Sequence, residues 1–226
     1  MAAASPKPLF LFGTLRYRPL LEVIIGSDHY RLVDCEFVDH AVQPASGEAH
    51  PILMTQPGAR ALGALCYNLT TAQRQALDFY EALFDYRIED VDVVADTGSA
   101  AACVYRPAGP ELASSETWSL NEWVEMWGET TVHAAREVME LRDKISSDEL
   151  KKRFSTIRAR AWSAYLGQRS SQQSGRMLGP LIRTNRHLGF YRLDEYRFRH
   201  ETVRGTLSDE ITREVFVGFD AALVLP

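Results

Sequence analysis

The sequence predicts an α+β fold: a small mixed β-barrel with helices, followed by a helical segment and an antiparallel β segment. Three observations predict it. Short β-branched and aromatic runs dominate residues 8–107, helical periodicity dominates 116–170, and alternation typical of antiparallel strands returns over 176–226. We therefore expect a barrel domain, a helical extension and a β segment with these respective boundaries.

Five segments of the first region have strand character, because each is short, apolar or β-branched, and bounded by turn-forming residues. They are Pro8–Phe12, Tyr30–Phe37, Ala61–Asn68, Tyr86–Val94 and Ala101–Arg106. Between the third and the fourth, Thr70 and Gln73 have the spacing of a capping box. An apolar stripe at helical spacing follows them: Ala76, Leu77, Tyr80, Leu83 and Phe84. One clear helix among several strands favours an α+β domain or a small barrel.

Two further helices are expected, over about 119–142 and about 146–168. Each begins with a serine that is followed three residues later by a glutamate, the spacing of a helix N-terminal cap. In the third region the strongest strand patterns are Gly189–Glu201 and Thr212–Leu225. The sequence stops at Pro226 inside an apolar run, so we expect the last strand to be cut short or completed by other means.

The composition is that of a globular protein. Of 226 residues, 46% are hydrophobic and 24% charged, and the formal net charge of −5 does not favour non-specific nucleic-acid binding. No apolar run approaches the roughly 20 residues of a membrane span, and MAAASPKP lacks the apolar core of a signal peptide. Cys35, Cys66 and Cys103 are odd in number and widely spaced, which indicates free thiols in a reducing compartment. We expect a cytoplasmic protein with no membrane partner.

The histidines and tryptophans carry no clear site signal. The six histidines are scattered, with no short-spaced pair and no acidic partner in a zinc-like register, so we expect no metal site. The four tryptophans fall in the helical region, where packing is expected rather than stacking on a ligand. They are Trp118, Trp123, Trp127 and Trp162.

The first candidate for chemistry is the run LFLFGTLR from Leu9 to Arg16, in which an apolar strand breaks at Gly13 into a polar turn. Glycine allows positive φ and close backbone approach, and successive N–H groups in such a turn form an anion-binding concavity. The alternative is a plain turn that ends a strand.

The second candidate is Glu81 in the stretch ALDFYEALFDYR. It follows Leu77 by four residues and Tyr80 by one, so it borders the apolar stripe of the predicted helix. Aromatic surroundings raise the pKa of a carboxyl group and make it a better proton acceptor near neutrality. The alternative is a solvated glutamate at the helix edge. Tyr86 and Arg87 are suited to orienting a substrate carboxylate or to an ordinary cross-strand pair.

Taken in order, these pieces resemble the γ-glutamylcyclotransferase-like (AIG2-like) family. FGTLR at a strand end, LDFYE in a helix, YR after a short gap and VY at the end of a later strand span roughly residues 8–106. The resemblance implies that Glu81 is catalytic. It also implies a set of substrate-binding residues: Phe12, Gly13, Thr14, Leu15, Arg16, Tyr86, Arg87 and Tyr105. The family's usual tyrosine before the glycine is Phe12 here.

The resemblance implies an enzyme that cyclises a γ-glutamyl amine or peptide to 5-oxoproline and releases the amine. The substrate's α-amine attacks its own γ-carbonyl, so the enzyme mainly has to fold the substrate into the reactive geometry. Glu81 would carry the proton and the loop amides would stabilise the oxyanion. No metal or cofactor is required.

The third region carries a second resemblance. GFYRLDEYRFRHE followed by REVFVGFDAALVLP is similar to the N-terminal part of ADP-ribose-pyrophosphatase-type Nudix proteins, and tellurite-resistance proteins combine an AIG2-like half with a Nudix half. The Nudix helix, with its spaced glutamates for Mg²⁺, has no match, so no pyrophosphatase activity is expected. The alternative to an enzyme is an idle AIG2-like module that serves as partner or dimerisation domain of a Nudix enzyme. For either function, the expected partners are a small-molecule γ-glutamyl substrate and a second copy of the chain, in a homodimer through the C-terminal β segment.

Overall fold

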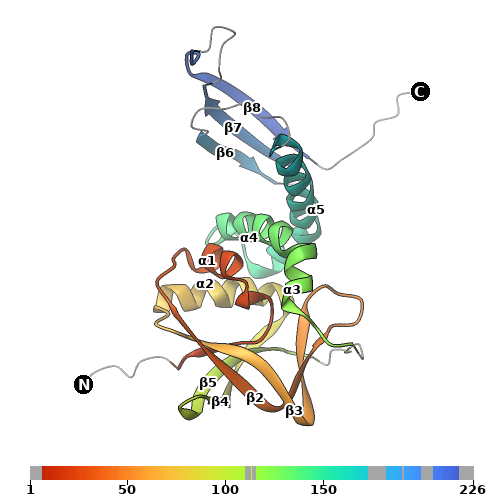
Figure 1. Ribbon diagram of the computed structural model, residues 1–226. Coiled ribbons are helices and arrows are strands. Elements are labelled where there is room, and N and C mark those ends of the chain that lie inside the picture. Colours follow the sequence, from red (N-terminus) through yellow and green to blue (C-terminus); the bar gives the residue numbers. More distant parts are fainter. Residues whose placement is uncertain are drawn as a thin grey trace. The chain divides into compact units, whose positions relative to one another are not determined.

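The computed structural model describes residues 7–109, 113, 116–172, 182–189, 191–199 and 206–218 (Figure 1). The chain divides into two compact units, Met1–Lys152 and Arg153–Pro226. The long helix α5 (Ser147–Gln172) spans the division. No helix in the described ranges is long and apolar enough to cross a membrane.

Five strands of the first unit close into a barrel in the order β1-β3-β2-β4-β5. They are β1 (Leu9–Leu11), β2 (Arg31–Pro44), β3 (Pro51–Tyr67), β4 (Tyr86–Ala95) and β5 (Gly98–Pro107). Neighbours run antiparallel except β1 and β5, which pair in parallel with Leu9 opposite Cys103. Because side chains alternate along a strand, one set fills the barrel, including Phe10, Leu65, Val93, Ala102 and Val104. The predicted α+β barrel with helices is confirmed.

Strands β2 and β3 are longer than the predicted segments, and they form one bent hairpin. A bulge separates Val38 from His40, with Asp39 between them in the left-handed region (φ 57°). The Asp39 carboxylate accepts a hydrogen bond from the Gly58 N–H group at 2.7 Å, which holds the bend. Beyond the bend, the outer half of the hairpin pairs His40 with Thr55 and continues to Pro44 opposite Pro51.

Three helices of the first unit contact one another above the barrel: α1 (Arg18–Ile25), α2 (Thr71–Glu81) and α4 (Glu129–Leu141) (Figure 1). Helix α1 is not among the elements predicted from the sequence. Its signals are local: a proline in the first turn, apolar residues that are buried at helical spacing, and Gly26 in the left-handed region (φ 66°) as its C-cap.

Helix α2 begins with the predicted capping box. Thr70 Oγ1 accepts from the Gln73 N–H group at 3.2 Å, and Gln73 Oε1 accepts from the Thr70 N–H group at 2.8 Å. The helix ends at Glu81, and the single 3₁₀ turn η2 (Ala82–Phe84) leads into β4. The reversal between them is completed by Asp85 in the left-handed region (φ 56°). Glu81 is thereby fixed where the helix meets the barrel.

The helix predicted over about 119–142 is interrupted. It consists of α3 (Leu120–Trp123), a π-helical segment η3 (Val124–Gly128) and α4. Gly128 packs against Tyr17, since a Cβ atom added there would lie 3.3 Å from Tyr17 Cε1. The π-helical segment therefore lies against Tyr17, the residue that follows the turn after β1.

The second unit contains a three-stranded antiparallel sheet, ordered β6-β7-β8. Its strands are β6 (Ile182–Leu188), β7 (Arg192–Phe198) and β8 (Ile211–Val217). β7 and most of β8 lie in the two predicted runs, while residues 190, 200–201 and 219–225 of those runs lie outside the described residues. On β7 the fully buried Asp194 pairs with Arg192 at 2.9 Å, so a charge inside the sheet is compensated.

Candidate active site

Glu81 is the buried titratable group at the junction of α2 and the barrel. Its side chain is 7% exposed, and in the described part of the chain no hydrogen bond or ion pair engages its carboxyl group. Burial raises the pKa of Glu81 to about 8, because desolvation disfavours the carboxylate. A carboxyl group with this pKa exchanges a proton readily at neutral pH.

Tyr105 lies within electrostatic reach of Glu81 and is held by a second carboxylate of α2. Its hydroxyl donates a 2.6 Å hydrogen bond to Asp78 Oδ1. The pKa of Tyr105 is raised by burial, then by this bond and the charge of Asp78, and further by the nearby charge of Glu81. Asp78 and Glu81 are three residues apart, so they project from neighbouring positions of one helix face. Tyr105 therefore stays a neutral phenol within electrostatic reach of Glu81.

The turn after β1 forms the 3₁₀ segment η1 (Thr14–Arg16). The Arg16 N–H group donates to Gly13 O at 3.0 Å and the Tyr17 N–H group donates to Thr14 O at 2.9 Å. The N–H groups of Thr14 and Leu15 precede this first bonded amide, and no backbone acceptor for them is found among the described residues. They are the amides available to an oxygen-rich ligand.

Gly13 has φ −117°, so positive φ is not the reason for glycine here. The reason is close approach: a Cβ atom at Gly13 would lie 2.8 Å from Pro51 Cγ at the start of β3. The Tyr86 hydroxyl donates to the Pro51 carbonyl oxygen at 3.5 Å, so both predicted residues meet the same proline. An aromatic chain of Tyr80, Phe84 and Tyr86 then connects this point to the end of α2.

The parallel pairing of β1 with β5 adds Tyr105 to this end of the barrel. With Leu9 opposite Cys103, Leu11 and Tyr105 come alongside two residues later, just before the Gly13 turn. The structure thus brings Glu81 together with Tyr105, and Gly13 together with Tyr86, at one end of the barrel.

Three of the predicted binding residues lie elsewhere. Arg87 is exposed, and its Nε atom pairs with Glu89 at 3.0 Å. Phe12 faces the barrel core, with its ring centroid 6.3 Å from that of Phe10. Phe12 and Arg16 both line a pocket that includes neither Glu81 nor Tyr105.

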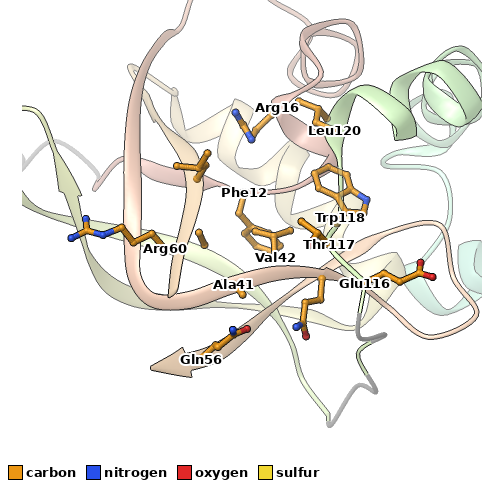
Figure 2. A pocket seen from close by; sticks show the side chains of 13 residues that line it. Phe12, Arg16, Ala41, Val42, Gln56, Arg60, Glu116, Thr117, Trp118 and Leu120 are labelled. Carbon is orange, nitrogen blue, oxygen red and sulfur yellow. The ribbon is translucent and has the colours of Figure 1, made fainter. Parts of the chain in front are cut away.

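This pocket has a volume of about 410 Å³ and lies between the η1 turn, the β2–β3 hairpin around its bend and the segment before α3 (Figure 2). Trp118 is one of its walls, although the sequence suggests packing for the tryptophans. The signal for Trp118 is not local, because the segment before α3 meets the hairpin through an isolated bridge between Ala45 and Ala113.

Asp78 is a candidate site residue that sequence reasoning missed. Its signal is the spacing in LDFYE, which places it one turn before Glu81, but its partner Tyr105 lies 27 residues further on.

The three cysteines offer no nucleophile, because burial raises the pKa of Cys35 and of Cys66 to about 11 and that of Cys103 above its usual range. In the described ranges, no group of three or more histidine, cysteine or acidic residues is placed to hold a metal ion.

Solved structures with a similar arrangement have low identity to this chain. Two Arabidopsis thaliana proteins solved in solution superpose with TM-scores of 0.44 and 0.43 at 17% and 16% identity, covering 63% and 61% of this chain and 89% and 93% of theirs. A structure named gamma-glutamyl cyclotransferase superposes with a TM-score of 0.43 at 10% identity, covering 66% of this chain and 86% of that one.

Two curated relatives share a short segment with this chain. The ADP-ribose pyrophosphatases of Escherichia coli K12 and Shigella flexneri are each 44% identical to it over 46 residues, which is 20% of this chain and 22% of theirs. The chain therefore spans about a fifth of the length of these relatives.

The match that decides the family covers the barrel and the start of the helices. Residues 9–125, slightly more than half of the chain, fit the sequence profile described as "Gamma-glutamyl cyclotransferase, AIG2-like". The matched range contains Glu81, the Gly13 turn, Tyr86 and Tyr105. This chain belongs to the γ-glutamyl cyclotransferase, AIG2-like family.

Proposed function

We propose that this chain is an enzyme that cyclises a γ-glutamyl amine or peptide to 5-oxoproline and releases the amine. The observation that carries the proposal is the state of Glu81, a buried carboxyl group without a partner among the described residues, whose pKa burial raises to about 8. Membership of the family supports the reaction class.

The reaction balances without water or a co-substrate. The substrate's α-amino nitrogen forms a bond to its own γ-carbonyl carbon and closes a five-membered ring. The bond from that carbon to the leaving nitrogen then breaks. The α-ammonium nitrogen loses two protons in all and the leaving nitrogen gains two, so the amine departs as an ammonium ion. Because attack is intramolecular, holding the substrate folded supplies a large part of the rate enhancement.

Glu81 is the group suited to move these protons. Its pKa of about 8 is close to the value of roughly 8 for an α-ammonium at a peptide N-terminus, and the free carboxylate beside the substrate's α-ammonium raises the pKa of that ammonium somewhat above this. Transfer of a proton from the ammonium to Glu81 is therefore only slightly uphill in free energy. The carboxylate accepts a proton from the α-nitrogen and, as a carboxyl group, donates it to the leaving nitrogen, one proton at a time. The neutral hydroxyl of Tyr105, anchored by Asp78, offers a fixed dipole beside this exchange.

The Thr14 and Leu15 amides are proposed to stabilise the oxygen that becomes negative in the tetrahedral intermediate. Both N–H groups lack a backbone acceptor in the described structure, and they come from a short, well-packed turn. Removal of one such donor typically costs about 3–4 kcal/mol of transition-state stabilisation.

The test is release of 5-oxoproline from a panel of γ-glutamyl amines, γ-glutamyl dipeptides and γ-glutamyl-ε-lysine by the full chain, with Glu81→Gln beside it. Turnover of any panel member by the wild type, lost in Glu81→Gln, supports the proposal. An inactive wild type that is folded and monodisperse rejects it.

The second candidate is an idle AIG2-like module that acts as partner or dimerisation domain of a Nudix ADP-ribose pyrophosphatase in a tellurite-resistance fusion. Two observations favour it: Phe12, which packs in the barrel where the family usually has tyrosine, and the 46-residue likeness to ADP-ribose pyrophosphatases. In this case the folding units are those proposed at 8–107, 116–170 and 176–226, and the last would carry the dimer contact in a cytoplasmic protein. Sedimentation of the full chain as a dimer, together with no turnover on the panel, would favour it.

A further inference from the structure

We infer that the pocket beside the η1 turn is a binding site for a small monocarboxylate with a planar apolar body, held by Arg16 and Trp118. The pocket is lined by Phe12 and Arg16 from the β1 turn, by Val42 from the hairpin, and by Trp118 and Leu120 from the segment before α3 (Figure 2). Its volume of about 410 Å³ lies within the range of small-molecule sites.

Arg16 supplies a half-buried positive charge, whereas Glu116, the acidic residue of the lining, is exposed to solvent. No hydrogen bond or ion pair to the Arg16 side chain is found in the described ranges. The second arginine of the pocket differs, because Arg60 Nη1 lies 2.5 Å from Glu36 Oε2 and its charge is compensated. A partly desolvated guanidinium without a counterion gains most from an anion that accepts two parallel N–H bonds, which is the geometry of a carboxylate.

The other residues that line the pocket indicate an apolar, planar body for the ligand. Phe12, Val42 and Leu120 are apolar, and the half-buried Trp118 offers an indole face. Planar apolar groups stack on such a face and gain from leaving water. A single carboxylate on an aromatic body matches the Arg16 guanidinium and these apolar walls, whereas the exposed carboxylate of Glu116 disfavours a ligand with a higher negative charge, such as inorganic phosphate.

The pocket is separate from the candidate active site. Successive side chains point to opposite sides of a strand, so Phe12 faces away from the side on which Leu11 and Tyr105 lie. Neither Glu81 nor Tyr105 lines the pocket. The site therefore does not depend on the proposed cyclisation, although its occupant would touch the turn that carries the Thr14 and Leu15 amides.

The test is a calorimetric titration of the full chain with 3-phenylpropionate and with its neutral isostere 3-phenylpropionamide. We expect saturable binding of the acid, at least about tenfold tighter than that of the amide, since a hydrogen-bonded charge is lost in the amide. Arg16→Met should remove the preference for the acid. Trp118→Leu should weaken both probes, and Arg18→Met, an exposed arginine two residues further on, should change neither.

Glu81→Gln is expected to bind the acid as the wild type does, which separates this site from the proposed reaction. Equal affinity for acid and amide, or an Arg16→Met protein that keeps the preference, overturns the inference. Absence of saturable binding in the millimolar range by a protein with native circular dichroism overturns it as well.

Discussion

The hydroxyl of Tyr105 donates a 2.6 Å hydrogen bond to Asp78, one helical turn before Glu81. The bond joins the end of β5 to the last turns of α2, two elements that are otherwise connected through η2 and β4. It fixes the position of Tyr105 relative to Glu81 because both carboxyl groups belong to the same rigid helix. In the proposed mechanism Asp78 is therefore a positioning residue, which acts by holding the Tyr105 hydroxyl.

Removal of the Asp78 acceptor should lower turnover without removing the proton carrier. We expect Asp78→Ala and Tyr105→Phe each to reduce kcat by roughly 10²-fold, the scale of a small misplacement of reacting groups, with less change in KM. Asp78→Asn keeps an acceptor oxygen for the Tyr105 hydroxyl and should recover most of the rate. Steady-state kinetics of 5-oxoproline release measure this.

The matched control for this prediction is Asp92→Ala, which removes an exposed carboxylate on β4. Wild-type turnover by Asp78→Ala would show that the Tyr105 hydrogen bond has no part in catalysis.

We predict that glycine is required at position 13 for full stability, because Pro51 leaves no room for a side chain there. A Cβ atom at Gly13 would lie 2.8 Å from Pro51 Cγ, so Gly13→Ala forces the turn and β3 apart and should cost about 1–3 kcal/mol of stability. In a Pro51→Ala background the obstructing atom is absent, and the same change should cost distinctly less. Urea unfolding of the four proteins of this double-mutant cycle gives the coupling. A Gly13→Ala cost that is the same in both backgrounds would refute the contact as its cause.

Glu81 should make the protein less stable as pH rises. Its pKa is raised by burial from the ordinary 4.5 to about 8 in the folded state, so the folded protein holds a proton that the unfolded chain releases above pH 4.5. Stability from this group is therefore full below pH 4.5, falls between pH 4.5 and about 8, and is constant above that.

Glu81→Gln removes this dependence. The variant should match the wild type near pH 4 and exceed it above pH 8 by an amount on the order of a few kcal/mol. The control is Glu125→Gln, an exposed glutamate of η3, whose stability should follow the wild type at every pH. Urea unfolding at a series of pH values checks this, and a constant difference between Glu81→Gln and the wild type would contradict the buried carboxyl.

Local signals account for what could be predicted of the fold. The capping box of Thr70 and Gln73 depends only on two residues three positions apart, and it forms as predicted. The apolar stripe of α2 likewise places Glu81 at the buried edge of the helix. The sequence does not predict the outer half of the hairpin, because Thr55–Arg60 contains Pro57, Gly58 and polar residues typical of a loop. In the structure the two ends of this segment, Thr55 and Arg60, pair with β2 on either side of the bend at Asp39.

The candidate site also contains residues that the sequence reveals and residues that only the fold reveals. Glu81 and Gly13 stand out in the sequence, whereas Asp78 gains its role from Tyr105, which lies on a strand far along the chain. The pocket formed by Arg16 and Trp118 depends on the segment before α3 crossing the hairpin, which no spacing in either segment reveals. These contacts join elements that are distant in the sequence and meet only when the barrel closes, so the sequence pattern does not predict them.

The most direct measurement is the pH dependence of kcat/KM for 5-oxoproline release by the wild type and by Glu81→Gln. For the wild type we expect a rise with pH governed by a group of pKa about 8, the value of the buried Glu81 carboxyl. For Glu81→Gln we expect a rate roughly 10²–10⁴-fold lower, without that ionisation. A Glu81→Gln enzyme with the rate and pH profile of the wild type would contradict the proposed role of Glu81.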